Sequence, residues 1–165
     1  MGRQKRKMNG PQREAARGAG KSVLIVDDNG DDIVLLQMAL RAAGLDVETA
    51  TAGDGEKAIQ YLNQRLVAGQ AFPSLVFLDL KMPNMSGWDV LRWLATQQGM
   101  RSMPVVVLTG SIRQEDHAEA VAQGAKEYWI KPHAFSDFVA LVRNNFERWL
   151  RGHLALRDPK ETGCR

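Results

Sequence analysis

Four short apolar segments of this chain each run into a polar, chemically reactive residue. The segments are 22–26, 75–78, 105–108 and 128–130, and the residues that follow them are Asp27 with Asp28, Asp79, Thr109 and Lys131. Short aliphatic and β-branched segments separated by helical patterns are typical of buried parallel strands. Functional sites of such sheets lie outside the carboxyl ends of the strands. The sequence therefore predicts one pocket that contains three carboxylates, a hydroxyl group and an ammonium group.

The spacing of the apolar residues predicts five strands that alternate with five helices. The strands are expected at about 22–26, 46–50, 75–78, 105–108 and 126–130, and the helices at about 31–43, 55–67, 87–97, 114–123 and 134–150. This alternation requires right-handed crossovers, which place helices on both faces of a sheet. We therefore expect an α/β fold with a doubly wound, parallel, five-stranded sheet.

Four of these segments carry more specific expectations. The segment 46–50 is polar, so we expect it at an edge of the sheet. The helix at 114–123 has a thin apolar stripe of Ala118, Val121 and Ala122. The last helix is richer in apolar side chains, namely Phe135, Phe138, Leu141, Val142, Phe146 and Trp149. Asp31 and Asp32 are placed in the first turn of the first helix, where acidic side chains favour the helix dipole, and we assign them no other role.

Charge is distributed unevenly along the chain. The formal net charge is +3, but residues 1–21 hold seven of the 22 Lys and Arg residues and one of the 19 acids, so the remainder is mildly acidic. We expect a basic, disordered arm at 1–20, a folded domain at 21–150 and a tail at 151–165. The arm is expected to make at most weak, charge-driven contact with nucleic acid or an acidic partner.

Two further observations concern the cellular compartment. No apolar run approaches the ~20 residues that a membrane span requires, so we expect no membrane association. Cys164 is the only cysteine and has no partner for an internal disulfide. A cytoplasmic location is therefore expected.

The predicted pocket favours phosphoryl-transfer chemistry. Three neighbouring acids repel one another unless a cation intervenes, and an all-oxygen site with few protein ligands suits Mg²⁺. We expect Asp28 and Asp79 to be direct ligands, and Asp27 to act directly or through water. An aspartate can be a nucleophile that forms an acyl phosphate, while Lys131 and Thr109 would offer positive charge and a hydroxyl donor to the phosphoryl oxygens. The sequence therefore predicts a site that forms an aspartyl phosphate.

The same residues resemble a known family. The chain reads Val26-Asp27-Asp28, Leu78-Asp79-Leu80-Lys81-Met82-Pro83 with Gly87, Leu108-Thr109-Gly110 and Tyr128-Trp129-Ile130-Lys131-Pro132. In this order the motifs resemble the response-regulator receiver domains of two-component signalling, which are CheY-like, over about residues 22–146. The loop at 69–73 and the aromatic end of the last helix are similar to small stand-alone regulators of phytochrome-type histidine kinases.

This resemblance implies a fold and a set of roles. The sheet would be flavodoxin-like, with strand order 2-1-3-4-5. Asp79 would accept a phosphoryl group from a kinase phosphohistidine, and the domain would not be a conventional enzyme. Asp27 and Asp28 would hold Mg²⁺ together with Asp79 and the main-chain carbonyl group of Lys81.

It also implies a switch. Thr109 would swing toward the phosphate, and Tyr128 would move inward with it. The Lys131-Pro132 peptide bond would be cis. Phosphorylation would then alter a protein contact, for which we expect homodimerisation through the last helices, with Phe146, Trp149 and Leu150 as a possible contact surface.

Several functions remain as alternatives. About 15 residues follow Leu150, too few for a helix-turn-helix unit, so we expect a single-domain regulator that acts by protein contact. An intermediate shuttle in a phosphorelay is one alternative. An aspartyl-nucleophile phosphatase of the haloacid dehalogenase kind is another, but it needs a second aspartate two residues after the first, where Lys81 stands.

Overall fold

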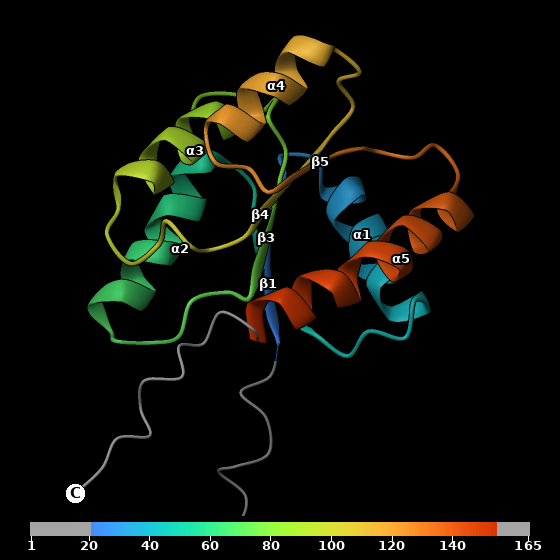
Figure 1. Ribbon diagram of the computed structural model, residues 1–165, viewed down its shortest axis with the longest axis horizontal. Helices are drawn as coiled ribbons and strands as arrows, with labels where there is room; N and C mark the ends of the chain where they lie inside the picture. Colours follow the sequence, from blue (N-terminus) through green and yellow to red (C-terminus); the bar gives the residue numbers. More distant parts are fainter. Residues whose placement is uncertain (1–20, 155–165) are drawn as a thin grey trace, which may run out of the picture.

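Strands and helices alternate throughout residues 21–154, the part of the chain that the computed structural model describes (Figure 1). The strands are β1 (Ser22–Val26), β2 (Glu48–Ala52), β3 (Leu75–Leu78), β4 (Val105–Thr109) and β5 (Glu127–Ile130). The helices are α1 (Gly30–Ala42), α2 (Gly55–Val67), α3 (Gly87–Thr96), α4 (Gln114–Ala122) and α5 (Phe135–Leu154). The expected basic arm and most of the expected tail lie outside the described residues, so the division into arm, domain and tail stays a prediction.

All five strands are parallel and follow the order β2-β1-β3-β4-β5, which confirms the predicted fold. The polar strand β2 lies at an edge, as expected, but it begins two residues later than predicted. The chain first closes α1, where the Leu45 N–H group donates to the Leu40 carbonyl group. Pairing with β1 starts only at Glu48, whose N–H group donates to the carbonyl oxygen of Lys21.

The sheet separates two apolar cores, because successive strand side chains point to opposite faces. In β1, Leu24 and Val26 pack in the core under α2, α3 and α4. Val23 and Ile25 pack in the core under α1 and α5. Figure 1 shows the two groups of helices on opposite sides of the sheet. Helices on both faces are therefore confirmed.

Helix α4 is anchored differently from the prediction. Its buried residue is Ala120, whereas Ala118, Val121 and Ala122 are exposed, so the predicted apolar stripe is wrong. The inward face is set instead by Ala120 and by Asp116, one turn earlier, whose carboxylate accepts a hydrogen bond from the Ser111 hydroxyl group. One small buried side chain makes α4 a weakly anchored helix.

Helix α5 also differs from the prediction. It continues to Leu154, four residues beyond the expected end. Phe146 is fully buried in the core with α1, because α5 lies across that helix, so the expectation that Phe146 forms part of a contact surface is wrong. The side chains of Trp149 and Leu150 lie outside the described part. Within residues 21–154, no helix combines the length and the apolar content needed to cross a membrane.

Candidate functional site

The structure brings the strand-end residues together at the carboxyl edge of the sheet. Main-chain hydrogen bonds fix three of them to the neighbouring strand: Asp27 N–H to the Ala52 carbonyl group (3.0 Å), Asp79 N–H to Val26 (2.9 Å) and Lys131 N–H to Thr109 (2.8 Å). These residues stand where the strands end, so their side chains leave the sheet at the same edge. Their convergence is therefore a product of the strand register.

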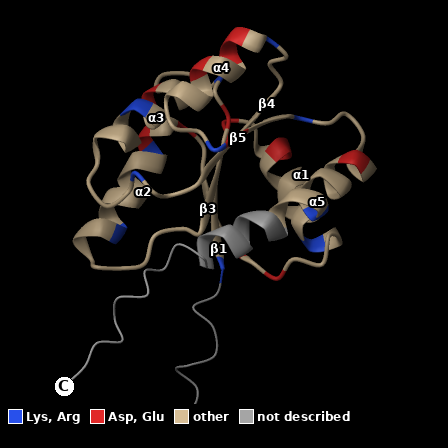
Figure 2. Ribbon diagram, in the orientation of Figure 1, with Lys and Arg blue, Asp and Glu red and all other residues tan. Residues whose placement is uncertain are grey.

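An acidic cluster lies at this edge, beside the start of α1, which Figure 2 shows in red. One carboxylate oxygen from each of Asp27, Asp28 and Asp79 lies within 4.8 Å of the other two. Asp27 and Asp79 are buried, while Asp28 is exposed. Three oxygen donors with an open side fit Mg²⁺, which retains several waters. The donor set is therefore suited to Mg²⁺.

Lys131 supplies the positive charge of the pocket. Its Nζ atom lies 2.6 Å from Asp27 Oδ2 and 2.7 Å from Asp32 Oδ2, and 3.8 Å from Asp79 Oδ2. Burial tends to lower the pKa of the Lys131 ammonium, but the hydrogen bonds to Asp27 and Asp32 outweigh this and raise the pKa above its usual value. The side chain therefore stays protonated at neutral pH.

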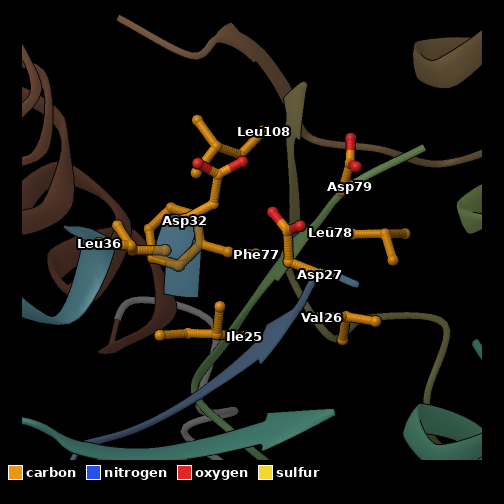
Figure 3. Close-up of a pocket in the computed structure, with 9 residues that line it drawn as sticks. All are labelled: Ile25, Val26, Asp27, Asp32, Leu36, Phe77, Leu78, Asp79 and Leu108. Carbon is orange, nitrogen blue, oxygen red and sulfur yellow. The ribbon is translucent and has the colours of Figure 1, made fainter. Parts of the chain in front are cut away.

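Asp32 is a site residue that sequence reasoning missed. We expected it only to favour the helix dipole, but it lines the pocket with Asp27 and Asp79 (Figure 3). A signal was present in the sequence, because Asp32 precedes the buried Leu36 by four residues and thus shares its helix face. Asp31, its neighbour, is exposed.

The carboxyl group of Asp79 is in an environment that disfavours its charge. Burial raises the pKa of Asp79, and the nearby charge of Asp27 adds to this effect. The ammonium of Lys131 acts in the opposite direction, but the net shift is upward. A bound cation would relieve this cost, since an adjacent positive charge favours the ionised carboxylate.

Thr109 and Tyr128 are connected through a loop residue that the prediction did not include. The main-chain N–H group of Ser111 lies 3.4 Å from Thr109 Oγ1, and its carbonyl oxygen accepts a hydrogen bond from the Tyr128 hydroxyl group at 2.9 Å. The Ser111 hydroxyl group in turn donates to Asp116 of α4. His117 packs edge-on against Tyr128, with ring centroids 5.3 Å apart. Ser111 therefore links the pocket to α4.

Gly87 holds the start of α3 against the main chain that carries Asp79. A Cβ atom at Gly87 would lie 2.1 Å from the carbonyl oxygen of Asp79 and 2.8 Å from Leu80 Cα. The Gly87 N–H group donates to the Leu80 carbonyl group at 3.1 Å. Ser86 caps the helix through a reciprocal hydrogen-bond pair with Asp89. The glycine thus permits a close approach that no other residue allows.

The peptide bond between Lys131 and Pro132 differs from the expectation. Residues 21–154 contain no cis peptide bond, so this bond is trans and the expected cis form is wrong. The trans form is the lower-energy isomer of X–Pro bonds by about 0.5–1 kcal/mol. The contacts of Lys131 with Asp27 and Asp32 are made with this isomer.

These features define a class. Residues 23–143 match the response regulator receiver domain family, and the chain therefore belongs to that family. The recognition made from the strand-end motifs is confirmed. Receiver domains are components of two-component regulatory systems and have no conventional enzyme role.

Solved structures of response regulators resemble this fold. The phosphorylated cyanobacterial phytochrome response regulator RcpA is 32% identical and has a TM-score of 0.73, and the match covers 81% of this chain and 96% of RcpA. The Mn²⁺-bound form of response regulator Rcp1 is 28% identical, with a TM-score of 0.67 and coverage of 79% and 94%. A metal ion is thus recorded in a relative of the same fold.

Sequence relatives point to the same family. The probable methanogenesis regulatory protein FilR2 of Methanothrix harundinacea is 33% identical over 128 residues, which is 78% of this chain and 83% of FilR2. The DNA-binding response regulator MtrA of Mycolicibacterium paratuberculosis is 35% identical over 126 residues. That match covers 76% of this chain, which spans about half (51%) of the length of MtrA.

Proposed function

We propose that this receiver domain accepts a phosphoryl group on Asp79 from a histidine kinase and signals through a phosphorylation-dependent protein contact. One observation carries the proposal: the buried Asp79 carboxylate lies at the end of the central strand β3, beside two further carboxylates and the Lys131 ammonium. The similarity to RcpA, which is a phytochrome response regulator, supports a phytochrome-type kinase as the phosphoryl donor. A cytoplasmic location fits this role.

The chemistry follows from the positions of the side chains. An Asp79 carboxylate oxygen attacks the phosphorus atom of a phosphohistidine, the new P–O bond forms as the P–N bond breaks, and the imidazole leaves. Lys131 and the Thr109 hydroxyl group provide positive charge and a donor for the phosphoryl oxygens. Asp27, Asp28, Asp79 and the Lys81 carbonyl group would hold Mg²⁺, which when bound offsets the negative charge of the phosphoryl group.

Metal dependence gives a first prediction. We expect Mg²⁺ to stabilise the folded domain by relieving repulsion among the three carboxylates, by about 1.4 kcal/mol at a concentration tenfold above the dissociation constant. Asp28→Asn removes an exposed ligand and should abolish most of this stabilisation and slow phosphorylation by acetyl phosphate. Thermal unfolding with and without Mg²⁺, and labelling with and without chelator, measure the two effects.

The control for this experiment is Asp31→Asn, which removes the same charge from an exposed side chain nearby on the chain. It should retain the response to Mg²⁺. A melting temperature that does not change at saturating Mg²⁺, together with labelling that a chelator leaves intact, would contradict the metal site.

We propose that the signal leaves the domain through α4. Ser111 links Thr109 and Tyr128 to Asp116, so a movement of Thr109 toward the phosphoryl group would disturb the hydrogen bonds that hold the start of α4. Val121 on α4 and Ile130 at the end of the edge strand β5 are half-exposed apolar side chains beside this path. They support self-association through α4, β5 and α5 in place of the buried Phe146.

Sedimentation tests this second prediction. With beryllofluoride and Mg²⁺ we expect a larger sedimenting mass than in the untreated protein, and Val121→Asp should reverse the change without affecting labelling of Asp79. Equal sedimenting masses and equal self-association in both states, up to the highest accessible concentration, would remove support for the switch.

The phosphatase alternative is not supported, because receiver domains lack a conventional enzyme role and Lys81 occupies the position of the required second aspartate.

A further inference from the structure

Three carboxylates compete for one ammonium group in the pocket. Lys131 Nζ makes short hydrogen bonds to Asp27 (2.6 Å) and Asp32 (2.7 Å), whereas its distance of 3.8 Å from Asp79 Oδ2 exceeds that of a hydrogen bond. The Lys131 side chain is 19% exposed and that of Asp32 is 33% exposed, so water screens this pair only in part. In this arrangement the Lys131 ammonium group is directed to Asp27 and Asp32, and not to Asp79.

We propose that Asp32 is a positioning residue that holds the Lys131 ammonium away from Asp79 and thereby slows the phosphorylation of Asp79. The inference rests on the proposed function of Asp79 as phosphoacceptor. It assigns Asp32 a role in setting the rate of that reaction, beyond a favourable interaction with the helix dipole.

The restraint has two physical components. An ammonium group has three N–H donors, and two of them are used by Asp27 and Asp32. The third donor does not form a hydrogen bond with Asp79, whose Oδ2 atom lies 3.8 Å from Nζ, so Lys131 must move away from Asp32 before it can approach a phosphoryl group at Asp79 closely. In addition, the charge of Asp32 lies on the pocket wall, where it repels an anionic phosphoryl donor (Figure 3). Both components oppose the transfer.

The position of Asp32 on α1 makes the restraint specific. Its face of the helix is fixed by Leu36, one turn later, which is buried in the core with α5. The preceding turn is fixed by Asn29, whose side chain caps the helix by accepting from the Asp31 N–H group. Asp32 is therefore held on a rigid element, while Asp31 points to solvent from the same turn.

This pair of neighbouring aspartates provides a matched experiment. The rate of phosphorylation by acetyl phosphate is measured at saturating Mg²⁺ for the wild-type protein, Asp32→Asn and Asp31→Asn. We expect Asp32→Asn to react roughly three- to tenfold faster, the range that loss of one partly screened ion pair allows, and Asp31→Asn to remain within about twofold of wild type. Each variant removes one charge from the first turn of α1, so the difference isolates the position of the Asp32 charge in the pocket, including its contact with Lys131.

Two further measurements separate positioning from a general effect. In the Lys131→Gln background, Asp32→Asn should accelerate the reaction less than it does in the wild-type background, because only the repulsion of the anionic donor remains to be relieved. Asp32→Glu alone should remain closer to wild type than Asp32→Asn. In the metal-free protein, a double-mutant cycle on urea unfolding should show favourable coupling between Asp32 and Lys131 and none between Asp31 and Lys131. The cycle is informative even if Lys131→Gln is too slow to label.

The outcomes distinguish this inference from the proposed function. If wild type is labelled on Asp79 but Asp32→Asn reacts no faster than Asp31→Asn, the restraint is wrong and the phosphoacceptor role stands. Absence of coupling between Asp32 and Lys131 would also overturn the restraint. If wild type is not labelled at all, the proposed function itself fails.

Discussion

Replacement of Gly87 by alanine is expected to lower the free energy of unfolding by roughly 3 kcal/mol or more and to slow phosphorylation of Asp79. The added Cβ atom would lie 2.1 Å from the Asp79 carbonyl oxygen, a contact with main chain that cannot rotate away. Either α3 must move off the sheet or the end of β3 must shift, and the second movement displaces the Asp79 side chain. Urea unfolding and acetyl phosphate labelling measure the two consequences.

Gly30→Ala is the matched control for this substitution. Gly30 and Gly87 are both the first residue of a helix, and each follows a capping side chain, Asn29 or Ser86. A Cβ atom at Gly30 would meet nothing within 4 Å, so alanine there should be neutral or stabilising by up to ~1 kcal/mol. If Gly87→Ala and Gly30→Ala unfolded at the same urea concentration, the close approach of α3 to the main chain of Asp79 would not explain a loss of stability in Gly87→Ala.

The strands and the strand-end residues could be predicted because one physical signal specifies both. A fully buried parallel strand needs an unbroken apolar run, and the run stops where the chain leaves the sheet. The limits of β3 and the positions of Asp79 and Lys131 follow from that signal. In β2 the signal is weak because an edge strand of alternating polar residues tolerates a shift, and the prediction was two residues early.

Features that depend on the rotation of a helix were harder to predict. The apolar pattern of α4 favoured Val121, but the hydrogen bond between Ser111 and Asp116 turns Ala120 inward. The role of Asp32 in the pocket was also hard to predict, because it depends on a hydrogen bond from Lys131, which is 99 residues away in sequence. Both contacts depend on how helices and strands are placed relative to one another, and the spacing of apolar residues within one helix does not specify that placement.

Replacement of Asp79 by asparagine is expected to change both phosphorylation and stability. Asp79→Asn preserves the size of the side chain but replaces the carboxylate nucleophile with an amide, so phosphorylation should fall to background. The raised pKa of Asp79 means that the folded state disfavours the ionised group, and above that pKa the charge costs stability. The asparagine variant should therefore be more stable than the wild type at neutral pH without Mg²⁺, as thermal unfolding would show.

Intact-mass spectrometry after incubation with acetyl phosphate and Mg²⁺ tests the phosphoacceptor role of Asp79 most directly. We expect the wild-type protein to gain the mass of one phosphoryl group and lose it again on hydrolysis, and the folded Asp79→Asn variant to gain none. Labelling of Asp79→Asn to the same extent as wild type would place the phosphoryl group elsewhere and contradict the proposed function.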